Sequence, residues 1–147
     1  SFLSFVSLSP IIYLQASANA EYLRKENSIM DDYLGSLKSL ITRGMFRAIT
    51  AHKEIFRDNP NISIALAYLN SATSYFTSAE ALYYSNPETY ENIFLADVFH
   101  CFSVFEKEFL DNARTNHSHQ WTDVEFQRLH DAFMSSPFRF KDDKLFS

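Results

Sequence analysis

The sequence predicts an all-α fold. Signals for helix starts recur along its 147 residues, and apolar residues nowhere alternate with polar ones as they do in a half-buried strand. The interior is expected to be large, because 16% of the chain is aromatic and each ring removes on the order of 150–250 Å² from water. The surplus of rings, 15 of them Phe, favours a cavity for an apolar guest or burial against a second copy. Tight packing is the simpler alternative.

Two helices are expected before residue 60. Ser9-Pro10 places a capping side chain before a proline at the first helical position, and this helix is expected to run to about Lys25. The segment Ser28–Asp31 resembles a capping box and opens a second, long helix. That helix is expected to end near Arg57, because Pro60 follows and the residue before a proline disfavours the α region.

Three further helices complete the prediction. The third is expected over Ile62–Tyr84. The segment Ser85–Glu88 repeats the pattern of a cap followed by proline, and it predicts a fourth helix that runs to about Ala113. The capping box Thr122–Glu125 opens a fifth helix that ends near Ser135. This length suits one domain, which would span residues 1–147.

The charge and the cysteine content exclude several classes of protein. A formal net charge of −5 argues against a nucleic-acid partner and against electrostatic binding to an anionic membrane. No run of 18 or more apolar residues predicts a membrane-spanning helix. The lone Cys101 cannot form an internal disulfide, so nothing calls for an oxidising compartment, and a cytoplasmic protein is expected. The apolar segment Phe2–Leu14 lacks the basic leader of a secretory signal.

The second helix carries a distinctive apolar face with small residues at its centre. Gly44 costs roughly 1 kcal/mol relative to alanine in a helix, which indicates that another helix crosses there at close range. The third helix is also rich in small residues, and steep crossings between such helices build a globin-like fold. The face consists of Leu37, Leu40, Ile41, Gly44, Ala48, Ala51 and Ile55.

A globin-like fold raises the question of haem, whose iron is held in globins by a proximal histidine. The connection at residues 85–87 holds no histidine, so no haem is expected. A haem sensor with His52 or His100 as the ligand stays an alternative. His117, His119 and His130 lack an acidic or cysteine ligand placed to complete a tetrahedral site, and no metal site is predicted.

Signatures of catalysis are absent from the sequence. It contains no Gly-rich phosphate loop, no nucleophile elbow and no HExxH motif. Cys101 lies in an aromatic run, where a thiol usually behaves as a small hydrophobic side chain. The chain is therefore not expected to be an enzyme.

Two arginines on the second helix are candidates for binding an acid. Arg47 lies at the edge of the apolar face and Arg43 lies further round the helix. The planar guanidinium fork binds both oxygens of a carboxylate, although an arginine in this position often only extends to water. His52 lies on the opposite edge of the face, where it would sense pH or be buried in its neutral form.

The fourth helix is expected to be apolar on almost every side, which is typical of a helix that is buried all round. A symmetric dimer through the fourth and fifth helices would cover rings such as Phe99, Phe105 and Phe109. The alternative is that the first helix and the segment Phe2–Leu8 cover them instead.

The chain resembles the non-haem globin sensor domains of bacilli, which comprise small plasmid-encoded sporulation-inhibitory proteins and the sensor domain of a sporulation histidine kinase. The resemblance implies a dimeric globin fold without haem and a hydrophobic tunnel. In the tunnel a fatty acid is expected, its carboxylate held by an arginine beside a chloride ion. The resembling stretches are Ile41–Arg47, Ala67–Ala72, Ala81–Tyr84, Asn86–Tyr90, Phe94–Phe105 and Phe109–Leu110.

The resemblance also implies a role, the inhibition of sporulation by titrating a signal of the sensor kinase or by pairing with it. The sequence contains no phosphotransfer helix and no ATP-binding motif, so a free-standing inhibitor is expected, with a trimmed domain of a sensor kinase as the alternative. A ligand-free dimerisation module is the alternative. For the fatty acid, Arg47 is expected to hold the carboxylate, with Arg43 as the second choice and His52 nearby. The expected tail-lining residues are Leu37, Leu40, Ile41, Leu66, Leu69, Phe76, Phe94, Val98 and Phe102.

Overall fold

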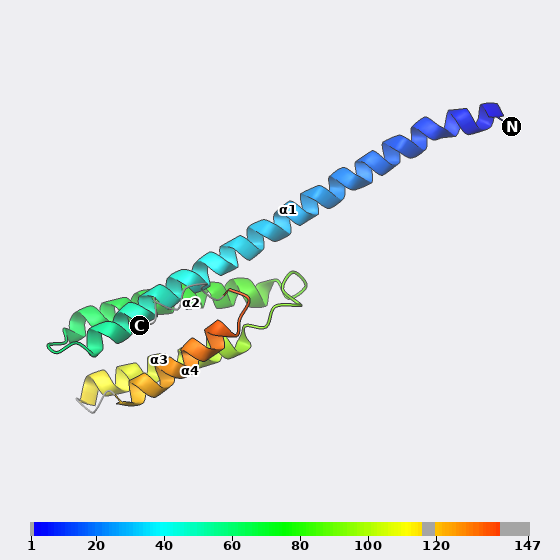
Figure 1. The fold of residues 1–147 in the computed structure, drawn as a ribbon. Helices are drawn as coiled ribbons and strands as arrows, with labels where there is room; N and C mark the ends of the chain where they lie inside the picture. Colours follow the sequence, from blue (N-terminus) through cyan, green and yellow to red (C-terminus); the bar gives the residue numbers. More distant parts are fainter. Residues whose placement is uncertain (1, 116–119, 139–147) are drawn as a thin grey trace. The chain divides into compact units, whose positions relative to one another are not determined.

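The computed structural model describes residues 2–115 and 120–138, and this part of the chain contains helices but no strand. The all-α prediction is therefore confirmed for the described residues. The helices follow one another as α1 (Phe2–Ile55), α2 (Ile62–Ser85), α3 (Ala96–Thr115) and α4 (Gln120–Met134) (Figure 1).

The chain divides into two compact units, Ser1–Ser36 and Leu37–Ser147. The first unit consists of the N-terminal part of α1, and every side chain described between Ile12 and Lys25 is exposed. The second unit contains the rest of α1 together with α2, α3 and α4. All the buried apolar side chains of the described residues belong to the second unit.

The predicted boundary between the first and second helices is wrong. α1 is continuous, so neither Ser9-Pro10 nor Ser28 begins a helix. A capping side chain stabilises a helix start but does not by itself interrupt a helix that precedes it. Between Lys25 and Ser28 the sequence has neither glycine nor proline, so no residue there opposes continuation of the hydrogen-bond ladder.

The third predicted helix is confirmed as α2. Asn61 caps it, because the Asn61 side chain accepts a hydrogen bond from the backbone N–H of Ile64 at 3.1 Å. Glu54, at the end of α1, accepts hydrogen bonds from the backbone N–H of Asn61 at 3.2 Å and from the guanidinium of Arg57 at 2.8 Å. The turn between α1 and α2 is therefore held by side-chain hydrogen bonds at both ends.

The predicted start of the fourth helix is wrong. The segment 86–95 forms turns and irregular backbone, and α3 begins only at Ala96. Asn86 ends α2 instead of opening a new helix, because its side chain donates a hydrogen bond back to the carbonyl of Leu82 at 3.0 Å. One asparagine, Asn61, thus caps the start of α2, and another, Asn86, closes its end. α4 begins two residues before the expected Thr122 and ends close to the expected position.

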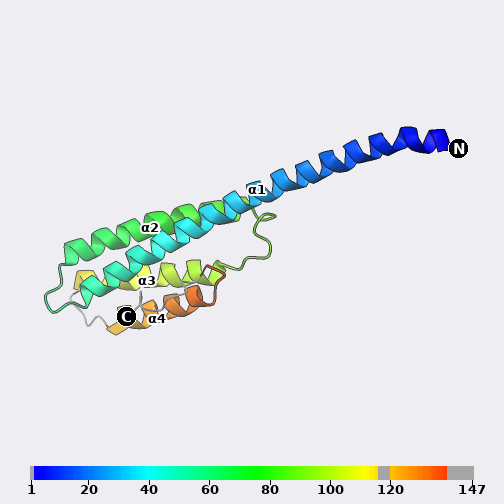
Figure 2. The same cartoon turned by 45° about the horizontal axis from the view of Figure 1, so that its top comes forward.

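Gly44 has the expected packing role, but the space beside it is filled by a phenylalanine ring of α2 and not by the backbone of a closely crossing helix. A Cβ atom at this position would lie 2.8 Å from the Cε2 atom of Phe76. Cβ atoms in protein structures essentially never come this close to another side chain. The Phe76 ring in turn stacks on Phe102 of α3 with ring centroids 4.0 Å apart. In both ribbon views α3 and α4 lie side by side, and the contact between them is the most extensive between any two helices (Figures 1 and 2).

The rings assigned to a dimer interface are buried within one chain. Phe99 is 5% exposed, and Phe105 and Phe109 are completely buried. The Phe126 ring of α4 lies 5.8 Å from that of Phe105, and the Tyr83 ring of α2 lies 5.6 Å from that of Phe99. The explanation of these three rings by a partner on the fourth helix was therefore wrong, because the neighbouring helices of the same chain already exclude water from them.

Candidate functional site

The surface of the second unit has a hollow of about 350 Å³ between α1 and α2. Residues at four positions of α1 and one position of α2 line it. Arg43 and Arg47 are four residues apart, which brings their side chains to the same side of the helix. The lining residues are Arg43, Phe46, Arg47, Thr50 and Tyr75.

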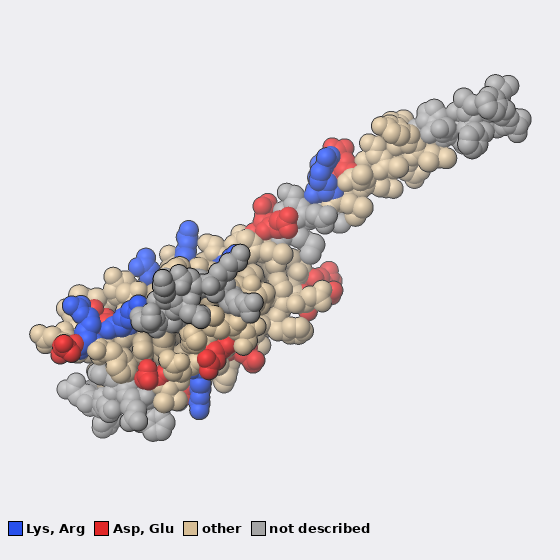
Figure 3. Space-filling view, in the orientation of Figure 1, with Lys and Arg blue, Asp and Glu red and all other residues tan. Residues whose placement is uncertain are grey.

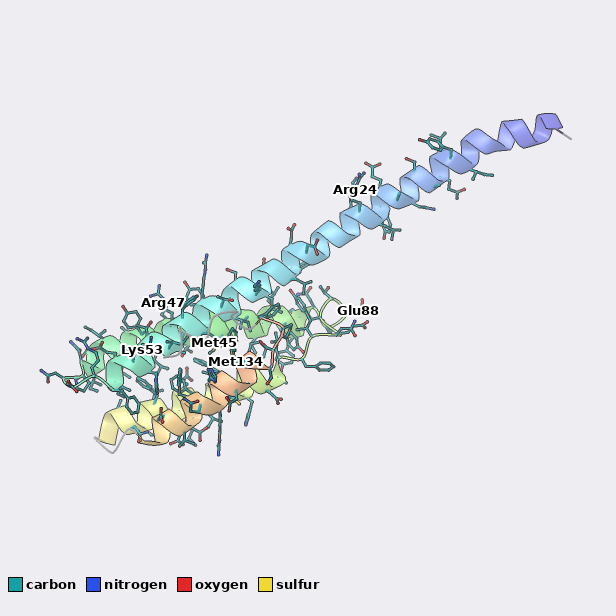
Figure 4. The ribbon with its side chains drawn as sticks, viewed as in Figure 1. Arg24, Met45, Arg47, Lys53, Glu88 and Met134 are labelled. Atoms are coloured by element: carbon teal, nitrogen blue, oxygen red, sulfur yellow. The ribbon has the colours of Figure 1, made fainter. Side chains whose placement is uncertain are left out.

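The guanidinium of Arg47 lies over an aromatic ring of α2. Its central carbon is 5.8 Å from the centroid of the Tyr68 ring, within the range of a cation–π contact. Arg47 is exposed, whereas Met45 is completely buried, and the two side chains project from opposite sides of α1 (Figure 4). Arg47 is therefore positioned by a ring and still accessible to a ligand.

No carboxylate neutralises the arginine pair within the described part of the chain. The ion pairs among the described residues use Arg24, Arg57, Arg128 and two histidines, but neither Arg43 nor Arg47. The Thr50 hydroxyl donates its hydrogen bond to the carbonyl of Phe46 at 2.8 Å, so it has no proton left for an anion. The positive charge of the hollow comes from the two guanidinium groups.

The structure separates the expected tail-lining residues from the arginines. Most of that set is packed into the core, and two of its rings, Phe76 and Phe102, are in direct contact. Leu40 and Leu66 are half-buried, and Phe94 is 82% exposed in the segment before α3. The core members are Leu37, Ile41, Leu69, Phe76, Val98 and Phe102.

Sequence reasoning identified Arg43 and Arg47 but missed Phe46, Thr50 and Tyr75. Phe46 follows Arg43 by three residues, and Thr50 follows Arg47 by three. Helical spacing alone therefore predicts that they lie beside the arginines. Tyr75 comes from another helix, and its place depends on how α1 and α2 pack.

His52 lies outside the hollow, between α1 and α4. Its Nε2 is 3.2 Å from Oδ1 of Asp123, and its ring stacks on that of Phe126 with centroids 3.8 Å apart. Burial lowers the pKa of His52 below its ordinary value of 6.5, and the positive charge of Lys53 adds to this. The hydrogen bond and the charge of Asp123 oppose the lowering of the pKa without cancelling it. His52 therefore links two helices and favours its neutral form.

The other candidates for chemistry are dispersed. Burial raises the pKa of the half-buried Cys101 thiol. His130 lies 3.1 Å from Asp131, His100 is exposed, and His117 and His119 fall outside the described residues. Within the described ranges no three His, Cys, Asp or Glu side chains gather as metal ligands do. None of the helices, as far as they are described, is apolar enough over a sufficient length to cross a membrane.

A scan against protein-family models, a search of curated proteins and a search of solved structures each found no match to this chain. The resemblance to the non-haem globin sensor domains therefore stays a prediction from the sequence.

Proposed function

We propose that this chain is a non-enzymatic sensor domain that binds the carboxylate of a fatty acid, or of a similar amphipathic acid, at Arg43 and Arg47. One observation carries the proposal: two guanidinium groups one helical turn apart, without a carboxylate partner among the described residues, border a hollow with aromatic walls.

The chemistry of the hollow suits a charged head followed by an apolar chain. A guanidinium binds a carboxylate through two parallel hydrogen bonds, which gives both strength and orientation. The rings of Phe46 and Tyr75 offer apolar surface to the methylene groups next to the carboxylate. The volume of about 350 Å³ is near the lower end of the roughly 300–1,000 Å³ that ligand pockets span. The hollow therefore favours the head and first part of an acyl chain.

The biological role in this proposal comes from the family resemblance. In that role the domain has a globin-like arrangement and inhibits sporulation by titrating the acid signal of a sensor kinase or by pairing with the kinase. A chloride ion is part of the same expectation. The resembling stretch Ile41–Arg47 contains both arginines, so the residues that support the role also support the ligand.

Isothermal titration calorimetry with decanoate, laurate and palmitate tests this function. We expect Arg47→Ala and Arg43→Ala each to weaken binding about tenfold or more, because a hydrogen bond to a charged group contributes about 1.5–3 kcal/mol. Lys38→Ala is the matched control, since it removes one positive charge from another exposed position of α1. Absence of binding by the unaltered protein, or equal affinity of all the variants, would contradict the proposal.

A second candidate function is homodimerisation, and the exposed apolar side chains of the first unit favour it. Ile12, Tyr13, Leu14, Tyr22 and Leu23 are each between 56% and 73% exposed along a helix that has no other element beside it within its unit. Most helices in proteins owe their stability to packing of an apolar face. We therefore infer that two copies pair through the side of this helix that carries Ile12 and Leu23. Light scattering coupled to size-exclusion chromatography measures whether the chain is dimeric.

A further inference from the structure

A second hollow lies at the opposite end of α2 from its Asn61 cap, and it differs in chemistry from the arginine hollow. It has a volume of about 210 Å³, and three of its five lining residues are tyrosines. Its only charged lining residue is a glutamate. We call it the tyrosine hollow, and it is lined by Tyr83, Tyr84, Pro87, Tyr90 and Glu91.

The rings of the tyrosine hollow stand at different angles. Tyr83 meets Tyr84 edge-on, with centroids 5.0 Å apart and planes inclined at 79°. Tyr83 and Tyr90 are nearly parallel, with centroids 5.9 Å apart. At these separations the rings are in contact with one another, so a ligand lies against the ring surface that they leave open and not between them. An open ring face still attracts a cation within about 6 Å of its centroid.

Hydrogen bonds fix these walls before any ligand arrives. The Tyr83 hydroxyl donates to the carbonyl of Ile93 at 2.6 Å, which ties α2 to the segment before α3. The backbone N–H of Ile93 donates to the carbonyl of Tyr90 at 2.9 Å, and Tyr90 is only 2% exposed. Tyr84, at 58% exposed, leaves one side of the hollow open to solvent. A ligand therefore meets a site that is already formed.

The charge around the tyrosine hollow is negative. Residues 80–97, which include every lining residue of the hollow, contain no lysine or arginine but have four carboxylates. Figure 4 places Glu88 on the loop between α2 and α3, and Figure 3 shows acidic side chains where this loop lies. A cation is therefore attracted and an anion is repelled. The four carboxylates are Glu80, Glu88, Glu91 and Asp97.

We propose that the tyrosine hollow binds a small quaternary ammonium compound of the choline type. Ring faces attract a cation that carries no tightly held water, and Glu91 supplies a carboxylate beside them. A hard metal ion does not fit, because Ca²⁺ takes six to eight oxygen ligands and the lining offers one carboxylate. The site is independent of the arginine hollow, which takes an acid.

Calorimetric titration with choline and with its neutral carbon isostere, dimethylbutanol, tests the site. The two compounds have nearly the same shape, so only the charge distinguishes them. We expect choline to bind at least about tenfold more tightly, since a desolvated cation–π contact contributes about 2 kcal/mol or more. Equal affinities, or no heat with choline, would overturn the proposal.

Two variants with matched controls assign the binding to this hollow. Glu91→Gln removes its charge and Tyr84→Leu removes a ring wall, and we expect each to weaken choline binding about tenfold. Glu21→Gln and Tyr13→Leu make the same changes at exposed positions of the first unit and should leave binding unchanged. Because Tyr84 and Glu91 are exposed, both variants are expected to fold. Choline binding that survives both changes would exclude the tyrosine hollow, whatever the outcome with fatty acids.

Discussion

At the scale of single residues, the two glycines of the chain lie in the same helix but in opposite surroundings. A Cβ atom at Gly44 would meet the buried ring of Phe76 at 2.8 Å, whereas one at Gly35 would have no atom within 4 Å. The Phe76 ring cannot easily move away, because it stacks on Phe102. Alanine is therefore opposed by packing at one position and unopposed at the other.

The prediction is that Gly44→Ala and Gly35→Ala change stability in opposite directions. Overpacking costs about 1–3 kcal/mol and exceeds the roughly 1 kcal/mol that alanine gains in a helix, so Gly44→Ala lowers the free energy of unfolding. Gly35→Ala meets no packing conflict, so the higher helix propensity of alanine should raise the free energy of unfolding by up to about 1 kcal/mol. Urea denaturation measures both values. A stabilising Gly44→Ala would show that the Phe76 ring does not lie as close to Gly44 as described.

His52 predicts a pH dependence of stability. Burial lowers its folded-state pKa below 6.5, so on acidification the unfolded chain takes up the proton before the folded chain does. The His52 contribution to stability is then fully present above about pH 6.5 and is lost as the pH falls through the lower folded-state pKa. We expect the melting temperature of His52→Phe to fall less between neutral and mildly acidic pH than that of the unaltered protein.

The control for His52 is His130→Phe. His130 lies beside Asp131 within α4 and bridges no other helix through that contact. The same substitution there should leave most of the acid-induced loss in place. If His52→Phe and the unaltered protein lose stability in parallel, His52 is not the group responsible.

At the scale of elements, a phenylalanine within α3 and one in the segment before it differ in burial. Phe105 lies in α3 and is completely buried, whereas Phe94 precedes the helix and is 82% exposed. Phe105→Ala should therefore lower the free energy of unfolding by about 3–5 kcal/mol. Phe94→Ala should change it by no more than about 0.5 kcal/mol. Thermal or urea unfolding measures both, and a large loss from Phe94→Ala would contradict the late start of α3.

Helix boundaries were predictable from the sequence where a local signal acts alone. α2 has an Asn cap at one end and an Asn-Pro sequence at the other, and both limits were predicted to within a residue or two. The limits of α1 and α3 were not predicted, because a capping residue such as Ser28 or Ser85 is compatible with more than one local structure. The sequence alone does not show which of these structures is the more stable. The chain continues as helix at Ser28, and Asn86 bonds backward to Leu82.

At the scale of the whole molecule, the candidate site was only half predictable. The position of Arg47 at the edge of an apolar face follows from helical periodicity alone. Whether the apolar residues beside it form a tunnel or a packed core depends on contacts between helices, such as the stacking of Phe76 on Phe102. Helical periodicity predicts which face of a helix is buried, but it does not predict whether side chains or a ligand pack against that face.

The proposed dimer makes a prediction about two leucines of the first unit. At about 100° per residue, Leu23 lies on the same side of α1 as Ile12, and Leu14 lies on the opposite side. Leu23→Glu should convert the dimer to a monomer, because it places a charge in the apolar contact. Leu14→Glu, at a similarly exposed position, should leave the dimer intact. Light scattering gives the mass of each, and a monomeric unaltered protein would contradict the pairing.

The head-group specificity of the arginine hollow tests the proposed function most directly. Laurate and dodecanol have the same number of carbon atoms in one unbranched chain and differ in the charge of the head group, which is the feature that Arg43 and Arg47 would recognise. Competition titration against the unaltered protein and the Arg43→Ala, Arg47→Ala double variant compares them. We predict that laurate binds at least about tenfold more tightly than dodecanol and that the double variant loses this preference. Equal binding of both compounds to the unaltered protein would contradict a carboxylate site at Arg43 and Arg47.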